Sequence, residues 1–188
     1  RCKTGIGGDD MKGFTRSSQL LSLCGLNCAL CPMLLGGHCG GCGNGNQSCG
    51  IARCSMEHGG VEYCFECGEY PCEKYRDIDR YDSFITHRRQ KADMERARDA
   101  GIARYNAEQL EKARMLRLLL DNYNDGRRKS LYCLAVNLLE LPELREALER
   151  IGPAAGLPEK ERCALAAVTL REIADRRGVE LKLRRRPR

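Results

Sequence analysis

Ten cysteines crowd residues 24–72, and this cluster constrains the fold more than any other part of the chain. They are Cys24, Cys28, Cys31, Cys39, Cys42, Cys49, Cys54, Cys64, Cys67 and Cys72. Three pairs have the spacing Cys-x-x-Cys: Cys28/Cys31, Cys39/Cys42 and Cys64/Cys67. Two intervening residues let one tight turn bring both sulfurs onto a single ion. Glycine directly follows the second and third pairs, where positive φ would let backbone N–H groups point at the thiolates.

Disulfide bonds are the competing interpretation of the cluster, and they require an oxidising compartment. Residues 1–20 are glycine-rich, polar and charged, without the apolar stretch of a secretory signal. The sequence also has no run of eighteen apolar residues. We therefore expect a cytoplasmic protein that binds metal through its cysteines and does not associate with membranes.

Zinc is the metal that best suits Cys-x-x-Cys-Gly turns, because four thiolates hold it in tetrahedral geometry. The second and third pairs would form one zinc-ribbon-like quartet with a long loop between them. The first pair and Cys24 would share a second ion with Cys49, Cys54 or Cys72. About two ions would then be bound, and either His38 or His58 would be a further candidate ligand.

An iron–sulfur cluster is the alternative cofactor. The spacing Cys24-x-x-x-Cys28-x-x-Cys31 is the one with which radical S-adenosylmethionine enzymes bind a [4Fe–4S] cluster. The alternating strands and helices of such an enzyme do not follow in the sequence. The alternative function is therefore an iron–sulfur protein with a redox or sensing role.

The cysteines belong to longer strings that resemble a known family. These strings are Leu23-Cys-Gly-Leu-Asn-Cys-Ala-Leu-Cys-Pro32, Cys39-Gly-Gly-Cys42, Val61-Glu-Tyr-Cys-Phe-Glu-Cys-Gly-Glu-Tyr-Pro-Cys-Glu-Lys74, Asn124-Asp-Gly-Arg127 and Ser130-Leu-Tyr-Cys133-Leu-Ala-Val-Asn-Leu-Leu139. The pattern resembles the uncharacterised cysteine-rich domain-of-unknown-function family 3795 over most of residues 20–150. The resemblance implies a zinc-type metal-binding module and carries no established activity.

Helices are predicted after the cysteine cluster, so the fold class is mainly α with a small irregular metal module of the zinc-knuckle or ribbon type and little β structure. We expect a flexible leader over residues 1–19, the metal module over 20–75, a helical domain packed on it over 76–178, and a short strand with a basic tail over 179–188. Predicted helices span Asp82 or Ser83 to Ala100, 106–122 with Leu110 on its apolar face, a segment capped by Ser130, and segments opened by Pro142 and Pro158. Alternating Val179, Leu181 and Leu183 predict the strand.

Function is less well defined than fold. The sequence holds no His-Glu-x-x-His, Gly-x-Ser-x-Gly or phosphate-binding loop, so an interaction or scaffold unit with a protein partner is favoured over an enzyme. Residues 127–129 and 184–188 are basic and raise nucleic-acid binding as a second alternative. The formal charge of +6 falls to +6 − 4 = +2 if two four-thiolate sites each carry −2, which supports that alternative only weakly. Cys133 is expected to be a free buried thiol, and Cys2 to take no part.

Overall fold

A computed structural model describes residues 14–44 and 48–187. Across these two ranges the regular structure is helical and no strand forms, so the prediction of a mainly α fold is confirmed. The one β-type contact there is an isolated antiparallel bridge between Leu21 and Asn27. Cys2, which we expect to take no part in metal binding, lies outside the described residues.

The cysteine region, residues 20–75, is built from short elements joined by turns. It contains the helices α1 (Pro32–Leu35) and α2 (Gly50–Glu57) and the single 3-10 turns η1 (Cys28–Leu30), η2 (Cys64–Glu66) and η3 (Glu73–Tyr75). Residues 14–19, the described part of the expected leader, contact this region: Phe14 is buried, and the Arg16 guanidinium lies 4.7 Å from the centre of the Tyr63 ring. Much of the backbone here therefore has no long helix to support it.

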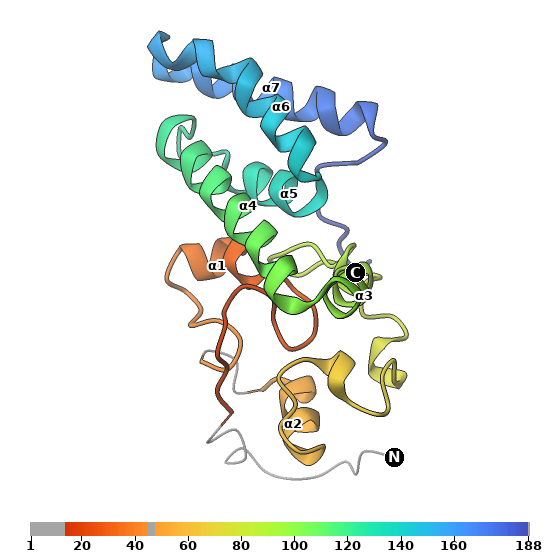
Figure 1. Ribbon diagram of the computed structural model, residues 1–188. Coiled ribbons are helices and arrows are strands. Elements are labelled where there is room, and N and C mark those ends of the chain that lie inside the picture. The colour runs from red at the N-terminus through yellow and green to blue at the C-terminus, as the bar shows by residue number, and fades with distance from the viewer. Residues whose placement is uncertain (1–13, 45–47, 188) are drawn as a thin grey trace.

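Longer helices make up the rest of the chain. They are α3 (Gln90–Ala100), α4 (Ile102–Asn122), α5 (Lys129–Leu138), α6 (Leu141–Ile151) and α7 (Glu159–Arg176), with the 3-10 turn η4 (Gly152–Gly156) before α7. Figure 1 shows α6 and α7 side by side at one end, α2 at the opposite end, and α4 running between them. Pro142 and Pro158 stand where α6 and α7 begin, as predicted.

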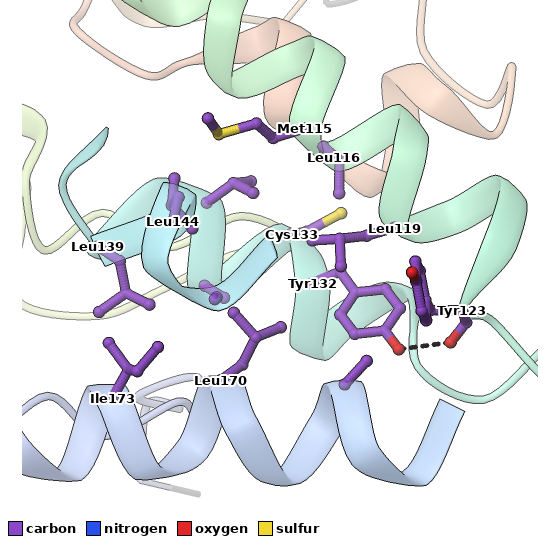
Figure 2. Packing of buried hydrophobic residues seen from close by; sticks show 14 of the residues in the cluster. Met115, Leu116, Leu119, Tyr123, Tyr132, Cys133, Leu139, Leu144, Leu170 and Ile173 are labelled. Atoms are coloured by element: carbon purple, nitrogen blue, oxygen red, sulfur yellow. Dashed lines mark hydrogen bonds between the residues drawn. The ribbon is translucent and has the colours of Figure 1, made fainter. Parts of the chain in front are cut away.

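One apolar core joins α4 to α7 (Figure 2). Its buried members include Leu116, Leu119, Tyr123, Tyr132, Cys133, Leu139, Leu144, Leu170 and Ile173. The Tyr132 hydroxyl donates a hydrogen bond to the carbonyl oxygen of Tyr123, so even its polar atom is satisfied inside the core. Burying a large apolar side chain contributes about 1.5–3 kcal/mol, so this core stabilises the four helices without help from an ion.

The predicted helix over 82–100 is wrong in its first half, because α3 begins only at Gln90. The Asp82 carboxylate accepts hydrogen bonds from the backbone N–H of His87 at 2.7 Å and from the hydroxyl of Thr86 at 3.2 Å. An Asp side chain that binds nearby backbone in this way competes with helical hydrogen bonding. Asp82 thus fixes an irregular turn and does not cap a helix.

Three further expectations are corrected. Leu110 is 44% exposed and does not belong to the apolar face of α4. Ser130 lies inside α5, whose first residue is Lys129, and no side chain caps that end. Residues 179–183 do not form a strand, because their backbone groups bind an arginine side chain instead of a neighbouring strand: Arg88 donates to the carbonyl oxygens of Glu180 and Lys182 at 2.7 and 2.9 Å.

Candidate metal centre

A small cavity in the cysteine region is lined by four thiols from three different elements. The cavity has a volume of about 30 Å³, and its lining includes Cys54, Cys64, Cys67 and Cys72 together with His58, Tyr70 and Tyr75. Its size suits one ion or one water molecule. Thiols from residues up to eighteen positions apart therefore face one small space.

Local backbone structure places each of these thiols. Cys54 lies in the last turn of α2. Cys64 and Cys67 stand at the start and the end of η2, and the Cys67 N–H donates to the Cys64 carbonyl at 3.1 Å. Cys72 precedes η3, where the Tyr75 N–H donates to its carbonyl at 2.9 Å. The Cys64-x-x-Cys67 spacing thus forms the tight turn that the sequence predicts.

Tyr75 supplies a polar group beside the thiols that sequence reasoning missed. Its ring is only 3% exposed, and its hydroxyl has no hydrogen bond of normal geometry among the described residues. The hydroxyl adjoins Cys64 and lowers the pKa of that thiol, against the larger raising effect of burial. A hydroxyl in this position can donate to a thiolate, which is the support that outer groups give to metal ligands. No motif marks this role, because Tyr75 reads in the sequence as an ordinary apolar residue.

A second group of thiols surrounds the loop between Cys24 and Cys28. Cys24 and Cys28 are both electrostatic neighbours of Cys42, and Cys49 is a neighbour of Cys24 and Cys42. Cys39 also adjoins Cys42. Cys42 and Cys49 pack against the apolar cluster of Phe14, Leu23 and Ala52, which holds them near the Cys24 loop.

The thiols of Cys24, Cys28 and Cys64 are protonated at neutral pH when no ion is bound. Burial raises the pKa of Cys24 to about 11 and the pKa of Cys28 and Cys64 to about 12, and it raises the pKa of Cys42 as well. Neighbouring thiols add to the rise, because a second negative charge nearby is unfavourable. A bound cation would reverse both effects and displace the protons.

The grouping differs from the expected one. The expected quartet joins the second and third Cys-x-x-Cys pairs, but the third pair faces Cys54 and Cys72 while the second pair lies with Cys24, Cys28 and Cys49. Cys31 is an electrostatic neighbour both of Cys28 and of the buried Cys133 in α5. His38 is exposed, whereas the His58 ring lines the cavity and is held by the Cys54 carbonyl at 2.8 Å.

The thiols are close but not in coordinating positions. Within residues 14–44 and 48–187, no three Cys, His, Asp or Glu side chains are arranged as a metal-binding group. None of the ten cysteines of the cluster forms a disulfide bond in the described part of the chain. The observed arrangement is therefore two adjoining groups of thiols, which meet where Cys64 neighbours Cys24.

Glycines adopt positive φ around the second Cys-x-x-Cys pair, Cys39/Cys42, but not directly after the third pair, Cys64/Cys67. Gly43, directly after Cys42, has a φ of +93°, and Gly41 has a φ of +89° with its N–H donating to the Cys39 sulfur at 3.4 Å. An L-residue rarely adopts this backbone conformation. Gly68, directly after Cys67, does not have a positive φ. The N–H-to-sulfur contact that the spacing predicts is thus present at Cys39.

Side chains of helix α3 form hydrogen bonds with the Cys24–Cys28 loop. The Gln90 amide donates to the Cys24 carbonyl at 2.9 Å. Within the loop, the Asn27 amide donates to the buried carboxylate of Asp93 at 3.0 Å and accepts from the Tyr105 hydroxyl at 3.0 Å. These partners lie more than sixty residues away in sequence, so no local pattern announces them. They fix the backbone that carries two of the cysteines.

Comparisons with protein-family models, with curated proteins and with solved structures found no match to this chain. The resemblance to the cysteine-rich family therefore stays a prediction. No helix among the described residues has both the length and the apolar content to cross a membrane.

Proposed function

We propose that this chain is a metal-binding protein whose cysteine region takes up about two ions, with zinc favoured over iron–sulfur clusters. The observation that supports this best is the cavity of about 30 Å³ shared by Cys54, Cys64, Cys67 and Cys72. Four thiols are the complete ligand set of a structural zinc site. The second ion would use the group formed by Cys24, Cys28, Cys39, Cys42 and Cys49.

The residues present suit zinc in their chemistry as well as their number. Thiolate is the soft donor that zinc accepts in closed structural sites. Rotation about the Cα–Cβ bond moves a thiol sulfur without moving the backbone, so the lining thiols can turn inward. The unsatisfied Tyr75 hydroxyl beside Cys64 would gain a thiolate acceptor when the proton leaves that sulfur.

The proposed role of the ions is structural. All four positions at the cavity are thiols, which leaves no open position for a catalytic water. The metal-bound region would then serve as a rigid interaction or scaffold surface for a protein partner. An enzyme would need a further base, nucleophile or anion site facing the ion, and the ring of His58 is already engaged by the Cys54 carbonyl and by Glu69, 3.5 Å from Nε2.

Elemental analysis of the full chain, purified without oxygen, tests the proposal. We expect about two zinc ions per chain and no visible absorption, since zinc is colourless. Absorption near ~400 nm with stoichiometric iron would replace zinc by the iron–sulfur alternative. Protein with all thiols free and neither metal present in stoichiometric amount would overturn the proposal.

A matched pair of variants locates the site. Cys67→Ala removes a thiol from the cavity and should lower the metal content by about one ion per chain. Cys163→Ala removes a buried thiol of α7, far from the cysteine region, and should leave the metal content unchanged. Equal metal loss in both variants would indicate misfolding, and no loss in Cys67→Ala would reject this cavity as the site.

A further inference from the structure

Residues 180–187, the last that the structure describes, are bound against an earlier loop. In Figure 1 the segment after α7 runs toward α3. The Asp82 N–H donates to the Arg184 carbonyl at 2.8 Å, and the Arg184 N–H donates to the Asp82 carboxylate at 2.7 Å. Arg88 holds the carbonyls of Glu180 and Lys182. The C-terminal segment, residues 180–187, is thus fixed on the 79–88 loop from both directions.

Five cations gather where this segment meets the loop, and none of them has a carboxylate partner among the described residues. They are Arg80, Lys182, Arg184, Arg185 and Arg186. Two of the guanidinium groups bind backbone instead: Arg184 donates to the Asp79 carbonyl at 2.6 Å and Arg185 to the Ser83 carbonyl at 3.3 Å. These contacts orient the charges and leave them unneutralised.

Four arginines on or directly after α6 and α7 behave differently. Arg145, Arg150, Arg176 and Arg177 each form an ion pair with a glutamate. The acidic residues of the 79–88 loop are already engaged: Asp79 pairs with Lys91 at 2.9 Å, and the side chain of Asp82 is fully buried. The positive charge at the C-terminal segment is therefore available to an external anion.

Aromatic rings stand among these cations. The guanidinium groups of Arg80 and Arg186 lie 5.2 and 5.7 Å from the centre of the Tyr81 ring. Phe84, three residues further along the loop, is 63% exposed, the highest value among the large exposed apolar side chains. An exposed, flat phenyl ring beside unpaired arginines offers a face on which a planar group can stack.

We propose that this basic–aromatic surface, formed by Arg80, Tyr81, Phe84, Lys182, Arg185 and Arg186, binds single-stranded nucleic acid. The cations would contact phosphate groups, while bases would stack on the ring of Phe84 and on the arginine–tyrosine stack. An acidic peptide would use the charges but not the flat rings, and an anionic membrane would need more than one exposed apolar side chain. This surface is separate from the thiol cavity, so the inference does not depend on the metal.

Fluorescence anisotropy with labelled single-stranded RNA and DNA of twenty nucleotides tests the inference on the full chain. We expect binding at 50 mM salt that weakens roughly fiftyfold by 200 mM, as four phosphate contacts on a single strand would give. Arg185→Ala/Arg186→Ala should weaken binding at least tenfold and lower the salt slope by about 1.4. The Phe84→Ala variant should weaken it roughly tenfold with an unchanged slope.

Matched controls separate this surface from general charge and general folding effects. Arg114→Ala/Arg117→Ala removes two exposed, unpaired cations from α4 and should change binding less than twofold. Leu118→Ala removes another exposed apolar side chain, 42% exposed, and should also have little effect. Thermal melts of all variants should coincide within a few degrees.

Three outcomes would overturn the inference. The first is no binding to either strand at 50 mM salt. The second is equal weakening by the α4 control pair, which would show that net charge alone acts. The third is binding to vesicles containing phosphatidylserine without binding to the oligonucleotides, which would identify a membrane surface instead.

Discussion

The two ends of the molecule solve the problem of stability in different ways. Residues 102–176 contain twenty-two buried apolar residues, whereas the described part of residues 20–75 contains six: Leu21, Leu23, Leu30, Ala52, Tyr63 and Tyr75. The helical end has one continuous core from α4 to α7. The cysteine end has two small clusters with thiols packed at their margins. In the cysteine region, thiol side chains therefore take positions around the core that aliphatic side chains take in the helical part.

This difference explains why the proposed ions matter at only one end. Ordering a residue costs roughly 1–2 kcal/mol of backbone entropy, which buried apolar area must offset. Six buried side chains contribute too little for a region of this length. A structural ion held by four thiolates contributes on the order of 10 kcal/mol, so it can replace a missing core. The helical end has no such need.

Metal removal should therefore produce the largest effect, and it should unfold the cysteine region while the helical part stays folded. After treatment with a strong zinc chelator under reducing conditions, amides of residues 20–75 should lose hydrogen-exchange protection, while those of α4 to α7 keep theirs. Hydrogen exchange read by mass spectrometry resolves the two ends in one experiment. Restored protection after zinc is added back is the control. Uniform loss at both ends would contradict the idea that the helical core stands alone.

Truncating the helical core tests the other half of the comparison. Leu170 is fully buried in α7, so Leu170→Ala should lower the free energy of unfolding by about 4 kcal/mol through lost burial and a residual cavity. Urea denaturation followed by circular dichroism measures the change. Metal content should stay the same. Leu165→Ala on the same helix, at a side chain 39% exposed, should cost less than about 0.5 kcal/mol.

The contact between the cysteine region and α3 can be strained by a substitution at one glycine. Gly25 has a φ of +95°, and a Cβ there would lie 2.3 Å from Cγ of Met94 and 2.6 Å from the Gln90 carbonyl oxygen. Gly25→Ala should lower stability by about 3 kcal/mol, because backbone strain and crowding against α3 add together. It should also weaken zinc uptake by the Cys24–Cys28 loop, measured by competition with a chromogenic chelator.

Gly37→Ala is the matched control for this strain. Gly37 also has a positive φ, +71°, but no atom lies within 4 Å of its would-be Cβ. It should cost about 1 kcal/mol, the backbone part alone. If both alanine variants lose the same stability, crowding by α3 contributes no free energy. The cysteine region and α3 are then less tightly coupled than the contacts indicate.

How far the sequence predicts this molecule depends on the range of the interactions involved. The helices of the C-terminal half follow from local apolar spacing and from Pro142 and Pro158. The Cys64–Cys67 turn follows from its spacing alone. The sorting of thiols into two groups does not, because it depends on where α2 and η3 place Cys54 and Cys72. Asn27, Asp93 and Tyr75 carry no motif either, since their roles arise from contacts between distant segments.

The start of α3 also shows that a distant contact can override a local sequence signal. Residues 82–89 read as helix because Asp82 and Ser83 are good caps in a charged segment. The competing partner of Asp82 is the Arg184 backbone, 102 residues away, and no local rule includes it. The predicted strand at 179–183 is wrong for the same reason, because Arg88 binds its carbonyl groups. Both errors arise because the 79–88 loop binds residues 180–187, which are distant in the sequence.

Glu140 gives the smallest expected effect and tests whether charge joins α6 to α3. Its carboxylate accepts from Arg89 at 2.7 Å and lies 3.5 Å from the Arg96 guanidinium, so it ties the start of α6 to α3. Partial burial raises the pKa of Glu140, but Arg89, Lys112 and Arg96 lower it by more, and the net pKa lies below its ordinary value. A lowered folded-state pKa stabilises the protein above the ordinary pKa of a glutamate and ceases to do so as pH falls through the folded-state pKa.

Glu140→Gln keeps an oxygen to cap α6 and removes only the charge. It should cost about 1 kcal/mol at pH 7, allowing for a side chain one-third exposed, and the difference from wild type should shrink below a pH of about 4.5. Urea titrations at several pH values measure this. Glu149→Gln, exposed on the same helix, should show no difference at any pH. A deficit in Glu140→Gln that persists unchanged into acid would mean that shape, not charge, joins α6 to α3, since only the charge term disappears when the carboxylate is protonated.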